Sequence, residues 1–183
     1  MSDAHAHFPS ITLGGGCFWC LEAVFSRLRG VVSVESGYCN GEGAAPSYED
    51  VCTGETGFVE VVQVRFDPSQ ISLAQLLQVF FQVHDATTLN RQGNDVGTQY
   101  RSGIYFADET QHAAARKALA EAQVTHGGRV VTELQALRSY SAAEAYHQRY
   151  FERNPQAGYC AFVIAPKVEK FRKAFKSLLI DGV

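Results

Sequence analysis

The sequence predicts an α+β fold, a two-layer sandwich in which helices cover one face of a mostly antiparallel sheet. The apolar residues alternate in some segments and recur at helical spacing in others. The first four strands and two helices obtained in this way follow the order β-α-β-β-α-β, which is typical of a ferredoxin-like core. With 183 residues, 46% hydrophobic and 19% charged, we expect one domain with an ordinary core, elaborated by extra helices and long loops.

The elements of this core follow from local patterns. We place strands at residues 11–13, 31–38, 58–66 and 102–107. A first helix starts at or near Cys17, and its apolar side chains are Leu21, Val24, Phe25 and Leu28. Ser72 caps a second helix, whose apolar side chains are Leu73, Leu76, Leu77 and Phe80. Residues 1–8 are expected to form a flexible N-terminal arm of a domain that spans residues 1–183.

Further elements would extend or wrap this core. We expect a surface helix over residues 109–124, a strand at 130–134 near an edge, a helix from the capping-box pattern at 141–144 through 150–151, and a last helix from Pro166. The basic residues of that last helix, Lys167 among them, are interpreted as its solvated face. The apolar run 161–164 would lock the preceding Cys160 in place if it forms a strand.

The segment Gly-Gly-Gly-Cys-Phe-Trp-Cys, residues 14–20, forms the turn between the first strand and the first helix. A helix N-terminus carries unpaired N–H groups and a partial positive charge, so we expect the Cys17 thiol to ionise readily there. The five cysteines lie at positions 17, 20, 39, 52 and 160. They lack the second close pair that a structural zinc site requires, so redox chemistry is favoured and no metal is expected.

Glu60 interrupts the apolar face of the strand at 58–66, where Phe58, Val62, Val64 and Phe66 share its side. If that face is the core, burial disfavours the carboxylate and raises the pKa of Glu60. A carboxylic acid that keeps its proton near neutral pH is a candidate general acid. The alternative is that Glu60 points to water or pairs with an arginine.

Two long polar loops also contain candidate residues. The segment after Cys39 runs for roughly twenty residues without a regular pattern, and loops of that length usually have a function. The second loop, residues 86–101, contains Asp95 and Tyr100 as possible acid–base or anchoring groups. His84, at the end of the preceding helix, is interpreted as structural.

Several of these segments match one known family in order. They are Gly16-Cys-Phe-Trp-Cys20, Tyr48-Glu-Asp-Val-Cys-Thr-Gly54, Gly57-Phe-Val-Glu60, His84-Asp85, Asn90-Arg-Gln-Gly-Asn-Asp95, Gly97-Thr-Gln-Tyr-Arg-Ser102 and Asn154-Pro to Gly158-Tyr-Cys160. With them the chain resembles the methionine sulfoxide reductase A family. The resemblance implies a peptide-methionine (S)-S-oxide reductase, an oxidoreductase that reduces the S epimer of methionine sulfoxide, free or in proteins.

The resemblance also implies a role for each matched residue. Cys17 would attack the sulfoxide sulfur and Glu60 would protonate the departing oxygen. Tyr48 and Tyr100 would hydrogen-bond that oxygen, and Asp95 would orient the site. Phe18 and Trp19 would form a pocket for the methyl group. The resulting sulfenic acid would condense with another thiol to a disulfide, which thioredoxin or another dithiol would reduce, with no bound cofactor or metal.

The resolving thiol is left open between Cys160, which matches a resolving position of the family, and Cys20, which lies one helical turn from Cys17. A relay through both is a further alternative, Cys39 is a weaker candidate, and Cys52 is interpreted as structural. This sequence departs from many relatives in having Phe58-Val59 where they have His-Ala, Ala86 where Pro is usual, and Cys20 where many have Gly. The first of these makes the surroundings of Glu60 more apolar.

Two other functions fit parts of the pattern. A C-x-x-C at a helix start also fits a general thiol–disulfide oxidoreductase, although that activity would not need Glu60 and the two tyrosines. The third possible function is a non-enzymatic zinc or interaction module. The net charge of −3 gives no electrostatic reason to expect nucleic acid or membranes as partners. The sequence has no apolar run of roughly 18 residues and begins without a basic, apolar leader, so we expect a cytoplasmic protein. We also expect it to be a monomer.

Overall fold

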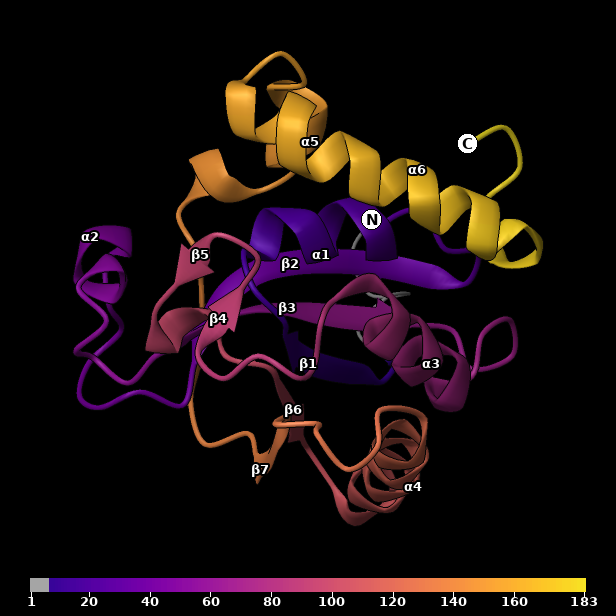
Figure 1. Cartoon of the computed structure of the whole chain (residues 1–183), viewed down its shortest axis with the longest axis horizontal. Coiled ribbons are helices and arrows are strands. Elements are labelled where there is room, and N and C mark those ends of the chain that lie inside the picture. The colour runs from indigo at the N-terminus through magenta and orange to yellow at the C-terminus, as the bar shows by residue number, and fades with distance from the viewer. Residues whose placement is uncertain (1–6) are drawn as a thin grey trace.

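The computed structural model describes residues 7–183 and is built on a six-stranded sheet in the order β7-β6-β1-β3-β2-β8 (Figure 1). Its strands are β1 (Ser10–Gly14), β2 (Val31–Cys39), β3 (Val59–Phe66), β6 (Gly103–Phe106), β7 (Glu133–Ala136) and β8 (Tyr140–Ala142), and β4 (Arg91–Gln92) pairs with β5 (Asp95–Val96) in a separate hairpin. The helices are α1 (Phe18–Phe25), α2 (Tyr48–Cys52), α3 (Leu73–Val83), α4 (Glu109–Thr125), α5 (Tyr150–Arg153) and α6 (Ala165–Ala174).

The sheet is mostly antiparallel, which confirms the α+β class. Strand β1 lies between β3 and β6 and runs antiparallel to both, and β2 pairs antiparallel with β3 and β8. Only β7, at the edge beside β6, adds a parallel pair within the described residues. The expected strands and the two expected helices of the first half are all present, and Ser72 caps α3 through a capping box with Gln75.

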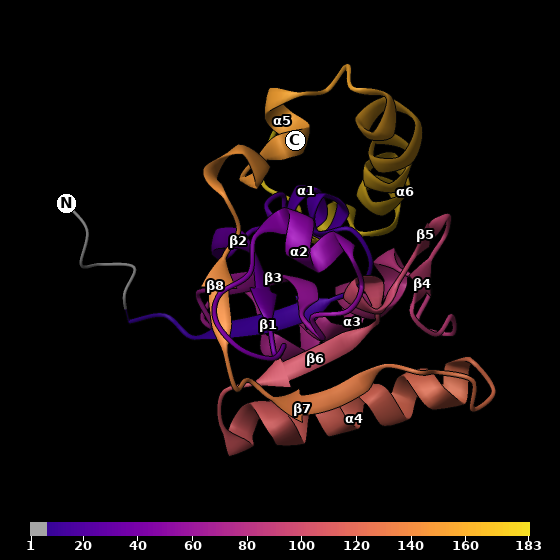
Figure 2. The same ribbon diagram turned by 90° about the vertical axis from the view of Figure 1, so that its left-hand side faces the viewer.

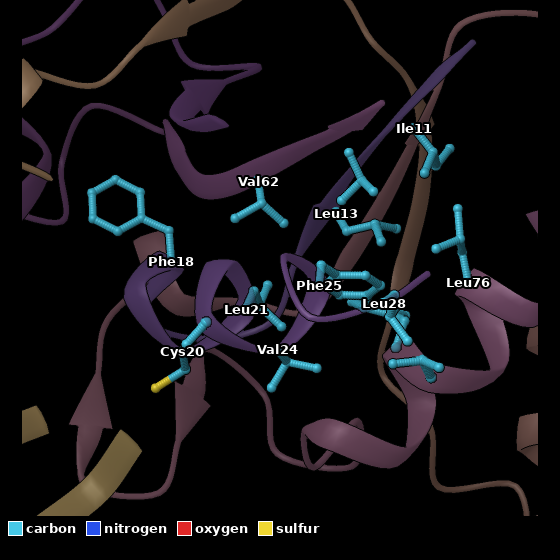
Figure 3. Close-up of a cluster of buried hydrophobic side chains, with 14 of the residues drawn as sticks. Ile11, Leu13, Phe18, Cys20, Leu21, Val24, Phe25, Leu28, Val62 and Leu76 are labelled. Carbon is cyan, nitrogen blue, oxygen red and sulfur yellow. The ribbon is translucent and has the colours of Figure 1, made fainter. Parts of the chain in front are cut away.

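The main core lies between the sheet and the helices α1 and α3. Fully buried side chains from β1, β3, α1 and α3 meet there, including those labelled in Figure 3: Ile11, Leu13, Phe18, Leu21, Val24, Phe25, Leu28, Val62 and Leu76. The other face of the sheet has a smaller cluster, in which Cys39, Val59, Val61 and Tyr105 lie beneath the chain that leads into β8. Alternation along β3 therefore sends Val62 and Val59 to opposite faces, as predicted.

Helices α5 and α6 form a further layer on the side of α1 away from the sheet, and α4 lies beside β7 at the other end (Figures 1 and 2). At its C-terminal end this layer reaches the chain that follows α1, where Leu179 pairs with Leu28. The contacts of α1 with both α5 and α6 hold it there. The helix that carries the Cys-x-x-Cys segment is therefore enclosed by protein on both sides.

Two sequence predictions in the C-terminal part are wrong. The capping-box pattern at 141–144 does not open a helix, because residues 140–142 pair with β2 as strand β8 and are followed by the 3-10 turn η2 (Ala145–His147). Glu144 instead accepts hydrogen bonds from the Tyr38 hydroxyl (2.9 Å) and the Tyr48 backbone (3.1 Å). The apolar run 161–164 is not a strand but part of the π-helical turn η3 (Cys160–Ile164), which leads directly into α6.

The loop after β2 is also more regular than expected, because it contains α2, capped by Ser47 through a capping box with Asp50. The expected arm at residues 1–8 lies mainly outside the described residues. Within them, the Phe8 carbonyl accepts a hydrogen bond from the Arg65 guanidinium (2.9 Å). The capping box of α2 therefore gives the loop after β2 a regular first turn. Separately, the hydrogen bond to Arg65 links the backbone at Phe8 to strand β3.

Candidate active site

Cys17 is the N-cap residue of α1, and only 9% of its surface is exposed. The chain turns sharply into this position through Gly16, whose φ of +93° is strained for residues with a side chain. A Cβ at Gly16 would also lie 2.6 Å from the Gln92 side chain. The glycine turn therefore lets the first turn of α1 approach the loop of residues 90–100 closely.

Glu60 reaches the same helix N-terminus from β3. Its carboxylate oxygen Oε2 accepts a hydrogen bond from the Phe18 backbone N–H (3.3 Å), the first amide after Cys17. The side chain is 1% exposed, and this burial raises the pKa of Glu60 to about 8. The alternative placements, in water or against an arginine, are excluded, and Glu60 is a buried carboxyl that keeps its proton at neutral pH.

The expectation that Cys17 ionises readily is wrong for this structure. Burial raises the pKa of the Cys17 thiol well above its ordinary value, and the hydrogen bond to Cys20 and the charge of Glu60 act in the same direction. The neighbouring Cys17 thiol is the largest cause that lowers the pKa of Cys20 to about 7, and the positive charge of Lys167 acts in the same direction. The helix N-terminus is not enough to ionise a thiol that is removed from water beside a carboxyl group.

Tyr48 and Tyr100 come close to this pair from two further elements, the start of α2 and the end of the 3-10 turn η1 (Thr98–Tyr100). Both rings are partly buried. Burial raises the pKa of each phenol, and the charge of Glu60 contributes to both shifts. The two hydroxyl groups therefore remain protonated donors close to Glu60.

Asp95 lies at the start of β5 and contacts the site through a residue that the sequence analysis did not single out. The Tyr159 hydroxyl donates to Asp95 Oδ2 (2.6 Å), and its oxygen is 3.8 Å from the Cys20 sulfur. On the same side, Lys167 Nζ is 3.8 Å from the Cys20 sulfur. The expectation that Lys167 belongs to the solvated face of the last helix is therefore wrong.

Phe18 and Trp19 form an aromatic cluster with residues of the C-terminal segment. Phe18 is fully buried, whereas Trp19 is partly exposed and stacks on Tyr150 with ring centroids 3.8 Å apart. The Trp19 indole N–H donates to His147 Nδ1 (3.1 Å), and the His147 ring also packs on Tyr48 at 4.4 Å. The interaction with His147 fixes the orientation of the indole beside the first turn of α1.

The matched residues from five separate segments thus converge on one end of α1, and the structure adds Tyr159, Lys167 and His147 to them. Of these three, only Tyr159 could have been found from the sequence, because it precedes Cys160 in the matched Gly-Tyr-Cys segment. The sequence around Lys167 fits a solvated helix and that around His147 fits a core position, so neither residue could be recognised as part of the site. Chemically, a thiol, a neutral carboxyl group and two phenols can deliver a nucleophile and protons to one small polar group.

A family model described as peptide methionine sulfoxide reductase matches residues 9–179. A protein of Chromobacterium violaceum named peptide methionine sulfoxide reductase MsrA is 53% identical over 169 residues, which cover 91% of this chain and 96% of the relative. A protein of Saccharolobus solfataricus with the same name is 52% identical over 90% of this chain and 93% of its own length. The chain belongs to the peptide methionine sulfoxide reductase family. It is an oxidoreductase that reduces methionine sulfoxide.

Solved structures of this family have the same fold. The reduced form of Mxr1 from Saccharomyces cerevisiae superimposes with a TM-score of 0.79 at 37% identity, covering 87% of this chain and 92% of Mxr1. A structure of the same yeast protein in complex with Trx2 matches with a TM-score of 0.56 at 27% identity, over 82% of this chain and 89% of that one.

None of the five cysteines of this reductase is in a disulfide. Cys160 is fully buried in η3, and burial raises the pKa of its thiol. Cys39 is buried on the face of the sheet opposite to Glu60, because its partner in the β2–β3 register is Val59. Cys52 is exposed at the end of α2, near the Tyr48 hydroxyl. The weaker candidate Cys39 therefore points away from the Cys17 thiol.

His84 is buried below the glycine turn, where its ring approaches Gly15. Its Nε2 is 2.8 Å from the Ser102 hydroxyl, and burial lowers its pKa to about 4. Such a histidine stays neutral at physiological pH and supports the turn, which agrees with a structural role.

Across residues 7–183, no group of three or more His, Cys, Asp and Glu side chains is arranged so that it could hold a metal ion. Within the same residues, no helix is long and apolar enough to cross a membrane.

Proposed function

We propose that this reductase acts on the S epimer of methionine sulfoxide, free or in proteins, with Cys17 as nucleophile and Glu60 as general acid. The observation that carries the proposal is the hydrogen bond from the Phe18 amide to Glu60 Oε2, which fixes a protonated carboxyl group next to the Cys17 thiol. A sulfoxide oxygen is a poor leaving group until it is protonated. A neutral acid beside a thiol answers that requirement.

In the first step the sulfoxide oxygen accepts hydrogen bonds from Glu60, Tyr48 and Tyr100. These donors withdraw electron density from the substrate sulfur. The Cys17 sulfur donates an electron pair to the substrate and takes over the oxygen as the S–O bond of the substrate breaks. Glu60 protonates that oxygen and the thiol proton returns to Glu60, so that one proton ends on the sulfenic acid. The products are methionine and Cys17 sulfenic acid, so two electrons move from the cysteine to the substrate.

Aromatic contacts provide a place for the methyl group of the substrate. Trp19 is partly exposed and held in a fixed orientation by Tyr150 and His147. Phe18 is fully buried and supports the indole from below, with ring centroids 6.4 Å apart. We therefore assign Trp19 direct methyl contact and Phe18 a role in shaping the base of that surface, while Asp95 orients the site through Tyr159.

Cys20 is the first resolving thiol in this proposal. It lies one helical turn from Cys17, and the neighbouring Cys17 thiol is the largest cause that lowers its pKa to about 7. Cys160 is buried, with a raised pKa, and it would take part only as a second member of a relay after η3 opens.

Thioredoxin, or another dithiol, is the reductant that would return the disulfide to thiols. The match with Mxr1 solved with Trx2 supports this partner. We also propose that the enzyme works as a cytoplasmic monomer without bound cofactor, that residues 1–183 form one catalytic domain, and that its core is ferredoxin-like. The sheet order β6-β1-β3-β2 with antiparallel neighbours supports the last point.

The test is to add one equivalent of each sulfoxide epimer separately to the fully reduced protein. The S epimer is expected to give one equivalent of methionine and a Cys17–Cys20 disulfide in peptide maps, and the R epimer neither. Equal yields from both epimers would contradict the stereochemical assignment, and a first disulfide from Cys17 to Cys160 would contradict the resolving role of Cys20. The reduction of the isolated disulfide by thioredoxin tests the partner.

A further inference from the structure

Lys167 differs from the other lysines of α6. It lies in the first turn of that helix and is half-buried, whereas Lys170 and Lys173 are exposed. Lys173 pairs with Glu169, but none of the ion pairs found among the described residues includes Lys167. Its ammonium group instead lies 3.8 Å from the Cys20 sulfur. Figure 3 shows the Cys20 sulfur pointing away from the labelled core side chains, which leaves it free to face α6.

We propose that Lys167 is a positioning residue for the second half of the reaction: it holds Cys20 as a thiolate aimed at the oxidised Cys17. The inference rests on the proposed function, since it concerns the step that follows methionine release. It assigns this lysine a role in disulfide formation and none in sulfoxide reduction.

The charges around Cys20 explain why a cation is needed there. The groups that face the Cys20 thiol from the packed elements are Cys17 from α1, Glu60 from β3, Asp95 from β5, Tyr159 and Cys160 from the C-terminal segment and Lys167 from α6. Lys167 is the cation in this set, and Asp95 opposes ionisation of Cys20. The Tyr159 hydroxyl also favours the Cys20 thiolate, but it donates its hydrogen bond at 2.6 Å to Asp95 and carries no positive charge.

The need for Lys167 becomes larger after the first half-reaction. In the reduced enzyme, the neighbouring Cys17 thiol is the largest cause that favours the Cys20 thiolate. Once Cys17 carries an oxygen, its thiol proton is gone and this contribution is lost. The Lys167 ammonium then supplies the positive charge beside the sulfur of Cys20.

The chemical step is balanced within the protein and solvent. The Cys20 thiolate gives its electron pair to the Cys17 sulfur, and an S–S bond forms. The S–O bond of the sulfenic acid breaks, its electron pair leaves with the oxygen, and the hydroxide takes up a proton to become water. Cys20 is oxidised and the Cys17 sulfur is reduced, so no further oxidant is required.

The experiment compares Lys167→Gln, Lys167→Arg and the control Lys170→Gln in single turnovers with methionine S-sulfoxide. Methionine release is followed by chromatography and the sulfenic acid by trapping with dimedone. Lys167→Gln is expected to release methionine at the wild-type rate but to close the disulfide roughly tenfold more slowly. Its rate should rise with pH over a window about one unit higher than in wild type. Lys167→Arg should recover most of the rate, and Lys170→Gln should match wild type.

Wild-type disulfide formation in Lys167→Gln, or an equal loss in Lys170→Gln, would overturn the inference. A failure to release methionine in the wild type would instead reject the proposed function, so the two failures are distinguishable. If Lys167→Gln does not fold, the alkylation of Cys20 is followed against pH in the Cys17→Ser background, with residue 167 as lysine, arginine or methionine. The midpoint pH of alkylation is expected to stay within a few tenths of a unit with Lys167→Arg and to rise with Lys167→Met. An unchanged midpoint with Lys167→Met would overturn the inference.

Discussion

The two ends of the first turn of α1 carry the same side chain in opposite electrostatic surroundings. At one end, Cys17 is buried beside the protonated Glu60, and its pKa is raised. At the other end, the pKa of Cys20 is lowered to about 7, first by the Cys17 thiol and then by Lys167 and Tyr159, which each lie 3.8 Å from its sulfur. Three residues along one helix thus separate an acid side, where Glu60 lies beside Cys17, from a cationic side, where Lys167 lies beside Cys20.

This difference teaches that the helix N-terminus does not by itself decide which thiol ionises. Burial and the nearest charged group outweigh the partial charge of the helix end, because both act over shorter distances in a medium of low polarity. The division matches two chemical tasks: the acid side activates a sulfoxide, and the cationic side prepares a thiolate. The predictions below test whether the two sides are in fact separable.

The largest effect is expected for Cys17→Ser, which removes the nucleophile and leaves the acid side otherwise intact. Reduction of methionine S-sulfoxide should fall by roughly 10⁴-fold or more. The measurement is methionine release in a single turnover, with Cys52→Ser as a matched control at an exposed cysteine. Appreciable turnover in Cys17→Ser would mean that another thiol attacks the substrate.

The next effect is expected for Glu60→Gln, which keeps the shape of the side chain and removes its ionisable proton. Loss of the general acid should slow sulfenic acid formation by about 10²–10⁴-fold, whereas disulfide closure through Cys20 should be unaffected once a sulfenic acid is generated with peroxide. In the wild type the first step should slow as pH rises through about 8, where Glu60 loses its proton. A first step with the wild-type rate and pH profile in Glu60→Gln would remove Glu60 from the mechanism.

Glu60 should also make stability depend on pH. Its ordinary pKa of 4.5 rises to about 8 in the folded protein, so between these values the folded state holds a proton that the unfolded state has released. The free energy of unfolding therefore falls as pH rises through this window, by a few kcal/mol at about 1.4 kcal/mol per unit. Melting curves of Glu60→Gln should show a gain in Tm over wild type that grows from pH 5 to pH 8; a constant difference would mean that Glu60 is not a buried acid.

A smaller effect is expected for Tyr48→Phe and Tyr100→Phe, which each remove one donor to the sulfoxide oxygen. A single hydrogen bond contributes about 1 kcal/mol, so each variant should lose about fivefold to tenfold in the first step. The double variant should lose more than either single one. Tyr146→Phe is a matched control, since its phenol is half exposed and its hydroxyl donates to Glu144 rather than facing Glu60. An equal loss in that control would point to a general effect on folding.

The smallest effect on turnover is expected for Cys39→Ala. Its thiol is buried on the far face of the sheet, and its pKa is raised to about 12 by burial. Sulfenic acid formation and disulfide closure should match wild type, while the free energy of unfolding drops by about 1 kcal/mol. Slower disulfide closure in this variant would place Cys39 in the relay after all.

Much of the fold could be predicted because its early elements have strong local signals. The alternation over β3, the stripe of α3 and the cap at Ser72 are all properties of short segments, and each was found where the pattern placed it. The C-terminal part could not be predicted in this way. Residues 140–142 became a strand because β2 offered an unpaired edge, and the run 161–164 became helical because it leads into α6.

The sequence by itself determined the glycine turn, the cysteine at the helix start and the carboxyl group on an apolar strand face, because each depends on neighbours in the chain. Only the tertiary structure decided that Cys20, rather than Cys17, has the lowered pKa, and that Lys167, 147 residues away along the chain, contacts it. The physical reason is that the pKa of a buried group depends on what lies around it in space. For Cys20 they include Cys17 from the same helical turn, but also Asp95 from β5 and Lys167 from α6, which no local pattern brings together.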